Sequence, residues 1–269
     1  MRFVDSCRRL LANPVCDHAL SALAGRTAAF YRIMPHNTLY PPHSFRRAKR
    51  HGIEWELDLS DWPDWCLYFH STTDSPLGVL SYVEEGDVVI DVGGNIGQTA
   101  LPLALALGDT GKVISFEPFP DTRRRFYRNL ELNPNLHVTV EPLALGDARG
   151  TAQMIRGCET NSGGNQIAEE GEQVPIVTLD EYVSEMDRVN LIKVDVEGYE
   201  LKVLEGATDV LDRHHPRLYL ELDDAALSRQ GASARQLLSF LARKGYQIVD
   251  AATGGRVNPD IHTDIYCRI

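Results

Sequence analysis

A glycine-rich turn is the part of this sequence whose residue types point most directly to chemistry. Residues 91–97 read Asp-Val-Gly-Gly-Asn-Ile-Gly and lie between an apolar run typical of a buried strand and a segment with helical character. In open α/β sheets such a strand-to-helix turn binds small ligands, because glycines let the backbone approach the ligand and the helix N-terminus attracts negative charge. We therefore expect a ligand at this turn.

The spacing of the glycines and the acid at the start of the turn narrow the kind of ligand. A dinucleotide fingerprint requires a glycine at position 92 to accompany Gly94 and Gly97, and this chain has Val92. The carboxylate of Asp91, at the mouth of the turn, would repel a pyrophosphate but attract an ammonium or sulfonium group. S-adenosylmethionine carries both cations, so the turn favours it over a nicotinamide dinucleotide.

A second acid follows at the spacing expected for a ribose contact. Glu117 comes 20 residues after Gly97, at the end of the next predicted strand. A carboxylate there can accept hydrogen bonds from both ribose hydroxyls of an adenosine, whichever cofactor carries it. Pro118 and Phe119 add a rigid apolar surface on which an adenine can rest.

A pair of acids two residues apart is the third chemical signal. Asp195 and Glu197 fall where a strand ends, so both are expected to project to one side of the sheet edge that also carries Gly93 and Glu117. A hydroxyl is a poor nucleophile until its proton begins to leave, so a carboxylate within reach promotes methyl transfer to oxygen. Asp195 is the first choice for this base, with contact to the cofactor ammonium as the alternative. Glu200 is expected to stabilise the dipole of the next helix.

Short apolar strands separated by helices must position these residues. The strands are expected at 88–90, 112–116, 137–140, 191–194 and 218–222, and the helices at 96–107, 121–132, 179–186, 199–211 and 234–244. This alternation predicts a parallel sheet with right-handed crossovers. Strands at 247–249 and 265–269, joined by a Gly-rich loop, form an antiparallel pair. The prediction is an α/β fold with a seven-stranded, mostly parallel sheet and a reversed last strand, with an irregular or antiparallel insertion at about 147–177.

Several segments, in this order and at this spacing, resemble the FkbM-type S-adenosylmethionine-dependent methyltransferases. They are Asp91-x-Gly93-x-Asn95-x-Gly97, Phe116-Glu117-Pro118, Thr178-Leu179-Asp180 and residues 193–200, which read Lys-Val-Asp-Val-Glu-Gly-Tyr-Glu. The resemblance covers roughly residues 53–269. It implies a Rossmann-like class I methyltransferase fold at 86–269 and methylation of hydroxyl groups, often on sugars of glycans or on natural products.

The resemblance also implies which residues contact S-adenosylmethionine. It assigns the methionine end to Asp91, Gly93, Asn95 and Gly97, the ribose to Glu117, and the adenine edge to the stretch from Ala144 to Asp147. Gln98 or Thr99 would bond the methionine carboxylate by side chain or backbone amide.

The candidate catalytic residues are Asp195, Glu197 and Glu221. The family often has Glu followed two residues later by His at the end of the fifth strand, whereas this chain has Glu221 and Asp223. That departure argues against a histidine base at this position. His262 lies in the loop before the reversed strand, which returns to the active edge, so it and His70 are candidates for substrate contact. Residues 161–165 are a candidate polar lid, with an ordinary flexible loop as the alternative.

The N-terminal region is predicted to be an arm or lid. Within an arm of residues 1–52, two short helices interrupted at Asn13-Pro14 are expected in residues 1–33. Residues 53–85 are expected to form a strand at 53–59 and helices at 61–69 and 76–83. The first 50 residues carry nine basic and two acidic side chains. The cluster at 46–50 is interpreted as a solvated turn; the alternative is that this arm holds the phosphates of a lipid-linked or nucleotide sugar.

Composition limits the class of protein. The 269 residues are 43% hydrophobic and 24% charged, with a net charge of −11, and no segment is apolar and long enough for a membrane span. The acidic main body lowers the expectation of a nucleic-acid partner. Five cysteines without a C-x-x-C pair favour a reducing, cytoplasmic compartment and argue against zinc.

The sequence therefore predicts an S-adenosylmethionine-dependent O-methyltransferase that acts on a small-molecule or glycan acceptor. The alternatives are an NAD-dependent oxidoreductase and a non-catalytic cofactor-binding scaffold. A metal-assisted variant would use Asp195, Glu197, Glu221 and Asp223 as oxygen ligands, although no metal site is predicted.

Overall fold

Seven strands form the central sheet of the computed structural model, which describes residues 8–23, 34–69, 76–158 and 160–269. Their order is β12-β13-β11-β10-β3-β4-β5. The bounds are β3 (Val88–Val92), β4 (Lys112–Phe116), β5 (Val138–Glu141), β10 (Leu191–Val194), β11 (Arg217–Leu222), β12 (Gln247–Asp250) and β13 (Thr263–Arg268). Neighbours are parallel except at β13, which is antiparallel to β11 and to β12. This confirms the predicted sheet with its reversed last strand.

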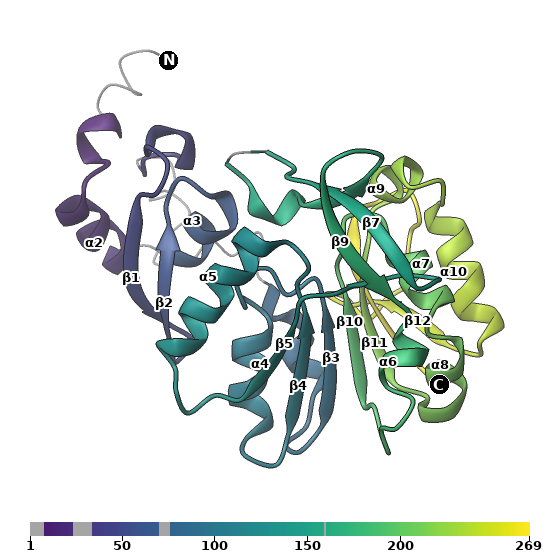
Figure 1. The fold of residues 1–269 in the computed structure, drawn as a ribbon. Helices are drawn as coiled ribbons and strands as arrows, with labels where there is room; N and C mark the ends of the chain where they lie inside the picture. The colour runs from purple at the N-terminus through teal and green to yellow at the C-terminus, as the bar shows by residue number, and fades with distance from the viewer. Residues whose placement is uncertain (1–7, 24–33, 70–75, 159) are drawn as a thin grey trace.

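Helices cover both faces of this sheet (Figure 1). One face carries α4 (Ala100–Leu107) and α5 (Pro120–Glu131), and the other carries α6 (Leu179–Tyr182), α7 (Glu200–Glu205), α8 (Thr208–His214) and α10 (Ala234–Arg243). Successive residues of β3 contribute to opposite cores, since Val89 packs in one apolar cluster and Ile90 in the other. Strands of a sheet that is covered on both faces are apolar along most of their length, and this is why the sequence predicted these strands.

The helices differ from prediction where the backbone makes a close turn. The helix expected from Ile96 begins at Ala100, because Asn95 and Gly97 adopt φ of +47° and +92°. The helix expected at 199–211 is two helices, α7 and α8, broken at Gly206, where a Cβ would lie 1.9 Å from the Gly146 carbonyl oxygen. The segment at 76–83 is a 3-10 helix (η3, Pro76–Tyr82), and α9 (Asp224–Arg229) was not predicted.

The insertion forms a second sheet. It contains β6 (Ala144–Leu145), β7 (Gly150–Ile155), β8 (Gln166–Ala168) and β9 (Glu172–Val177), in the order β6-β9-β7-β8. β7 is antiparallel to both β8 and β9, so the antiparallel alternative for 147–177 is correct. Figure 1 shows β7 and β9 crossing above the ends of the central strands.

A further layer lies beside α5 (Figure 1). It consists of a helical segment at 8–11, α2 (Pro14–Leu23), η2 (Asn37–Leu39), the antiparallel hairpin of β1 (Phe45–Arg50) and β2 (Ile53–Asp58), and α3 (Trp62–Phe69). We call residues 8–23 and 34–69 the N-terminal layer. Its buried Trp55 and Phe69 belong to the same apolar cluster as Leu101 of α4. The backbone N–H of Glu56 donates to Asn129 Oδ1 of α5 at 2.9 Å, so the layer is joined to the main body.

The described helices are short. The longest of them, α5, has 12 residues. In the part of the chain that the structure describes, no helix is long and apolar enough to cross a membrane.

Candidate functional site

A cavity of about 520 Å³ opens at the carboxyl edge of the central sheet. Its walls come from the turn after β3, the ends of β4 and β11, the loop after β10, the start of β13 and the insertion. This volume is in the range of sites that bind cofactors and other small molecules. The cavity therefore lies where the sequence placed the ligand.

The turn after β3 is shaped by close backbone packing. Gly93 has φ of +86°, and a Cβ there would lie 1.9 Å from the carbonyl oxygen of Asp195. The turn and the loop after β10 consequently touch through their backbones. Gly93 and Asn95 line the cavity. Gly97 does not line it; a Cβ there would meet the ring of Phe126 at 2.7 Å.

Glu117 is held at the cavity wall by two backbone donors. The N–H of Asn95 donates to its Oε2 at 2.8 Å, and the N–H of Phe119 donates to its Oε1 at 2.9 Å. Burial raises the pKa of Glu117 to about 7, and the two N–H donors oppose that rise. A carboxylate oxygen can accept more than one hydrogen bond, so each oxygen retains capacity for a ligand hydroxyl.

A buried lysine, which the sequence reasoning missed, lies beneath the cavity. Lys193 Nζ lies 3.4 Å from Asp91 Oδ1 and 3.4 Å from Asp195 Oδ2, and it donates to the Gly93 carbonyl at 3.1 Å. Burial lowers the pKa of Lys193, but Asp195 and Asp91 outweigh burial and raise it. The parallel register pairs Lys193 with Asp91, which is the signal that could have found this contact.

Asp91 does not stand at the mouth of the turn as predicted. Its side chain is fully buried, outside the cavity lining, and its Oδ2 accepts from Ser115 Oγ at 2.7 Å. Because Lys193 compensates its charge, Asp91 acts on the site through that lysine and through the position of β3.

The other predicted cofactor residues divide into two groups. Ala144 lines the cavity, together with its neighbours in the sequence. Thr99 and Asp147 do not: Thr99 is buried before α4 with no capping bond from its side chain, and Asp147 pairs with Lys202 Nζ at 2.8 Å. Gln98 lines the cavity, and its Nε2 is buried without a hydrogen-bond partner. A free amide donor is therefore available at the wall.

The three candidate catalytic acids also line the cavity, on the side of β10 and β11, whereas Glu117 follows β4, at the other end of the strand order β11-β10-β3-β4. Glu197 has φ of +55°, and burial, followed by the charges of Asp195 and Glu200, raises its pKa to about 7. Glu200 is itself buried, and its Oε1 accepts from the N–H groups of Val196 and Gly198 at 3.1 Å each. Glu200 thus fixes the loop that carries the other acids, which is a more specific role than the predicted dipole contact.

Glu221 joins residues of the reversed strand. Burial raises its pKa to about 9, with further contributions from Asp195 and Glu197. The antiparallel register sets Glu221 opposite Asp264 of β13, and His262 Nε2 lies 2.9 Å from Glu221 Oε1. His262 and Asp264 line the cavity, so the loop before β13 returns to the active edge as predicted. Asp264 was missed, and His70 lies outside the described residues.

Residues 162–166 form one wall of the cavity. Ser162 Oγ donates to Asn95 Oδ1 at 3.3 Å, and Asn165 Nδ2 donates to Thr122 Oγ1 at 3.0 Å. Ser162, Gly163 and Asn165 all line the cavity. The segment predicted to be a polar lid therefore lies against the glycine-rich turn after β3.

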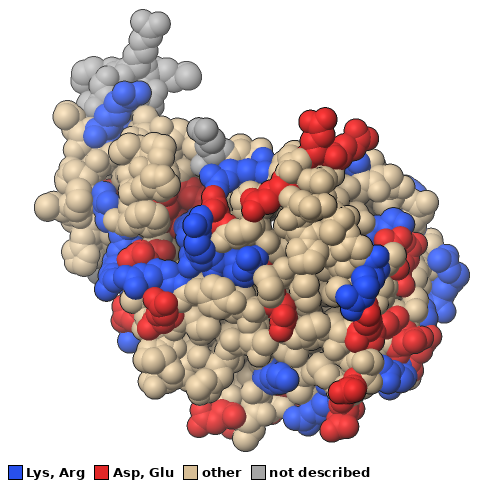
Figure 2. All heavy atoms as spheres, in the orientation of Figure 1, with Lys and Arg blue, Asp and Glu red and all other residues tan. Residues whose placement is uncertain are grey.

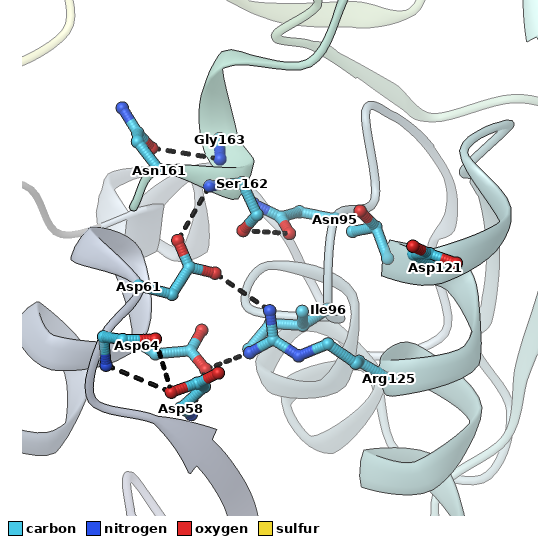
Figure 3. A network of polar contacts seen from close by, with 12 residues as sticks. Asp58, Asp61, Asp64, Asn95, Ile96, Asp121, Arg125, Asn161, Ser162 and Gly163 are labelled. Carbon is cyan, nitrogen blue, oxygen red and sulfur yellow. Dashed lines mark hydrogen bonds and ion pairs between the residues drawn. The ribbon is translucent and has the colours of Figure 1, made fainter. Parts of the chain in front are cut away.

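The N-terminal layer holds this lid in place (Figure 3). Asp61 Oδ1 accepts from the Ser162 N–H at 2.7 Å, and Asp61 Oδ2 accepts from Arg125 at 2.9 Å. Arg125 also bonds Asp64, whose pKa burial raises to about 7 while Arg125 lowers it. The Trp62 N–H donates to the carbonyl of residue 160 at 2.8 Å. One aspartate thus connects the lid, α5 and the N-terminal layer.

The basic cluster at 46–50 is part of strand β1, so its interpretation as a turn is wrong. Arg46 pairs with the buried Asp17 at 2.8 Å, and Arg47 and Lys49 pair with acids of β2. Arg50 donates to a backbone carbonyl, that of residue 68. Figure 2 shows basic and acidic side chains interleaved in the region of the N-terminal layer and α5. These internal partners weaken the alternative that the cluster holds phosphates.

Part of this chain matches a methyltransferase family, and two curated relatives are named as methyltransferases. Residues 91–248 match the family described as the methyltransferase FkbM domain. The chain is 36% identical over 138 residues to hexuronic acid methyltransferase AglP of Haloferax volcanii, and 30% identical over 146 residues to Methyltransferase 1 of Beauveria bassiana. These alignments cover 49% and 45% of this chain and 55% and 58% of those proteins, so the chain spans little more than half the length of either relative.

A solved structure supports the fold. The crystal structure of an FkbM methyltransferase from Methylobacillus flagellatus KT superposes with a TM-score of 0.50 at 15% identity. The superposition covers 98% of this chain and 60% of that chain. The two chains therefore share their fold.

Proposed function

The chain belongs to the family of methyltransferases with an FkbM domain, and from this premise we propose that it transfers a methyl group from S-adenosylmethionine to a hydroxyl group of a sugar, a glycan or a natural product. The observation that carries the proposal is that one cavity is lined both by Glu117, after β4, and by the carboxylates of the loop after β10 and of β11. Asp195, Glu197 and Glu221 are the proposed catalytic acids.

The residues at the first end fit S-adenosylmethionine. Glu117 keeps acceptor capacity for the ribose hydroxyls, and Phe116 and Ala144 offer apolar surface to the adenine. The unpartnered Nε2 of Gln98 is a donor for the methionine carboxylate. Gly93 and Asn95 let the backbone of the turn approach the amino-acid end. An unsatisfied buried donor at the wall is costly unless a ligand meets it, which supports the assignment.

The residues at the second end suit a hydroxyl acceptor. S-adenosylmethionine, when bound, supplies an electrophilic methyl group on a sulfonium centre. We assign the role of base to Glu221 in place of Asp195, because Glu221 lines the cavity and its raised pKa makes its ionised form a stronger base than an ordinary carboxylate. Asp195 already lies 3.4 Å from Lys193, so we assign it to orienting the acceptor and the cofactor.

The acidic lining also bears on the kind of acceptor. Hydroxyl groups donate to carboxylates, so Asp195, Glu197, Glu221 and Asp264 match a polyhydroxylated molecule. The name of the relative from Haloferax volcanii indicates that its substrate is a sugar acid. The carboxylate of a sugar acid would be repelled by these four acids. Neutral sugars and glycosides are therefore the first acceptors to screen.

Calorimetric titration of the purified protein with S-adenosylmethionine, S-adenosylhomocysteine and NAD tests the cofactor assignment. We expect micromolar binding of the two sulfur compounds and a loss of at least about 30-fold in affinity for Glu117→Ala, because two charge-assisted hydrogen bonds disappear. Glu117→Gln, which keeps the side-chain volume, and Glu185→Ala, at an exposed position, are the controls. Thermal denaturation establishes that each variant is folded.

Other outcomes of that titration would support the alternatives. Binding of NAD alone would favour the oxidoreductase, and cofactor binding without turnover on any acceptor would favour the scaffold. Among the described residues, no group of three or more His, Cys, Asp or Glu side chains is arranged to hold a metal ion. Loss of turnover in a chelator would nevertheless support the metal-assisted variant.

The contact between Asp61 and the lid gives a separate prediction. Asp61→Ala removes the acceptor of the Ser162 N–H, and we expect the dissociation constant for S-adenosylmethionine to rise about tenfold, the equivalent of one hydrogen bond of about 1.4 kcal/mol. The control is Asp109→Ala, at an exposed position. A lower melting temperature with unchanged cofactor affinity would show that Asp61 stabilises the N-terminal layer without positioning the lid.

A further inference from the structure

One cavity-lining residue has no part in the function proposed so far. His262 Nε2 lies 2.9 Å from Glu221 Oε1, across the antiparallel pair of β11 and β13. The two side chains differ in solvent contact, since the side chain of Glu221 is 21% exposed and that of His262 is 61% exposed. His262 therefore connects a largely buried carboxylate to solvent.

A buried base needs a way to lose the proton it gains. Glu221 is surrounded by carboxylates, and its raised pKa means that the protonated form is favoured near neutral pH. A proton accepted from one hydroxyl must leave before the next acceptor can react. In the cavity wall that the structure describes, His262 is the imidazole in hydrogen-bond contact with this carboxyl group.

We propose that His262 is the proton exit of the site. The acceptor hydroxyl gives its proton to Glu221 as its oxygen gains the methyl group and the sulfonium becomes a neutral thioether. Glu221 then passes the proton from Oε1 to Nε2 of His262, and the imidazolium releases the proton at Nδ1 to water. The carboxylate and a neutral imidazole are thereby restored, and exchange with water moves the remaining ring proton from Nε2 back to Nδ1 before the next turnover. His262 acts through Glu221 and is a positioning and relay residue, and the assignment rests on the proposed function.

The charges around His262 suit a transient imidazolium. Glu221 faces it from β11, Asp264 lies two residues further along the chain, and Asp195 and Glu197 line the same cavity from the loop after β10. The cation beneath this group, Lys193, is itself paired with Asp91 and Asp195. On the loop before β13, Asp260 is paired with Arg235 of α10 at 3.3 Å. A positive charge on the ring would thus be stabilised by nearby carboxylates.

The test compares His262→Ala and His262→Gln with the wild-type protein in weakly buffered solution. We expect kcat to fall on the order of tenfold to a hundredfold with the dissociation constant for S-adenosylmethionine unchanged by calorimetry. Added imidazole should restore turnover of His262→Ala and leave the wild-type rate as it is. His137→Ala, at an exposed position before β5, is the matched control.

A second readout needs neither cofactor nor turnover. The ¹⁵N NMR spectrum of the cofactor-free protein reports which ring nitrogen of His262 carries the proton. We expect Nδ1 to carry it while Nε2 accepts from Glu221, and we expect this signal to move in Glu221→Gln while that of His137 stays.

Three results would overturn the inference. These are full activity in His262→Ala, a loss that imidazole does not restore, and a His262 signal that Glu221→Gln leaves in place. Failure of the proposed function would look different, because the wild-type protein would then neither bind S-adenosylmethionine nor methylate any acceptor.

Discussion

Replacing Glu221 with glutamine is expected to lower kcat by about 10²- to 10⁴-fold, the range for loss of a general base. Glutamine keeps the size of the side chain but cannot accept the hydroxyl proton. The dissociation constant for S-adenosylmethionine should stay within about threefold of the wild-type value, because Glu117 and Gln98 at the cofactor end are unchanged. Steady-state kinetics with an acceptor that the wild-type protein methylates measure kcat, and calorimetry measures the dissociation constant for S-adenosylmethionine separately.

The same residue sets the expected pH dependence. Burial and the neighbouring acids raise the pKa of Glu221 to about 9, and only the ionised form accepts a proton. Below that pKa the ionised fraction grows about tenfold for each pH unit, so kcat/KM should rise about tenfold from pH 7 to pH 8 and level off above about 9. Glu221→Gln should lose this rise, and Glu185→Gln should keep it. A wild-type rate that is flat over this range would rule out Glu221 as the base.

The central sheet was predictable because its strands carry their own signal. β4 and β10 are buried on both faces and are therefore short runs of mostly apolar residues, so their bounds agree with the prediction. The starts of helices depend on backbone geometry that composition does not reveal. Asn95 and Gly97 adopt positive φ, and this delays the start of α4.

The candidate site was predictable as far as its residues follow single strands. Glu117 and Asp195 each follow a recognisable strand, and the ends of parallel strands meet at one edge. Residues that depend on pairing between distant segments were missed: Lys193 meets Asp91 through the parallel register, and Asp264 meets Glu221 through the antiparallel one.

The contact between the N-terminal layer and the lid was equally out of reach of the sequence. Asp61 and Ser162 are 101 residues apart, and their hydrogen bond forms only after the insertion has folded over the cavity. The local sequence around Asp61 indicates the start of a helix, and that around Ser162 indicates a polar loop. Neither local pattern predicts that the two residues are in contact. The N-terminal region was predicted to be an arm or lid, and in the structure its Asp61 contacts the segment that was predicted to be a polar lid.

Gly93→Ala is expected to have the largest effect on the site as a whole. The new Cβ would lie 1.9 Å from the carbonyl oxygen of Asp195, a backbone atom that cannot rotate away. The turn or the loop after β10 must therefore move, and with it the residues on either side of the cavity. We expect a destabilisation of about 3 kcal/mol or more, seen as a fall in melting temperature of about 6–12 °C, and no measurable binding of S-adenosylmethionine.

Gly254→Ala separates this steric effect from backbone strain. Gly254 has φ of +67°, close to the +86° of Gly93, but a Cβ there meets nothing within 4 Å. An alanine at 254 therefore carries the conformational cost of a positive φ alone, about 1–2 kcal/mol, and cofactor binding should remain. If both variants lose the same stability and both still bind S-adenosylmethionine, the contact between the turn and the loop after β10 does not shape the site. A large loss confined to Gly93→Ala would show that the two loops are built to touch, and that the glycine is needed for their approach.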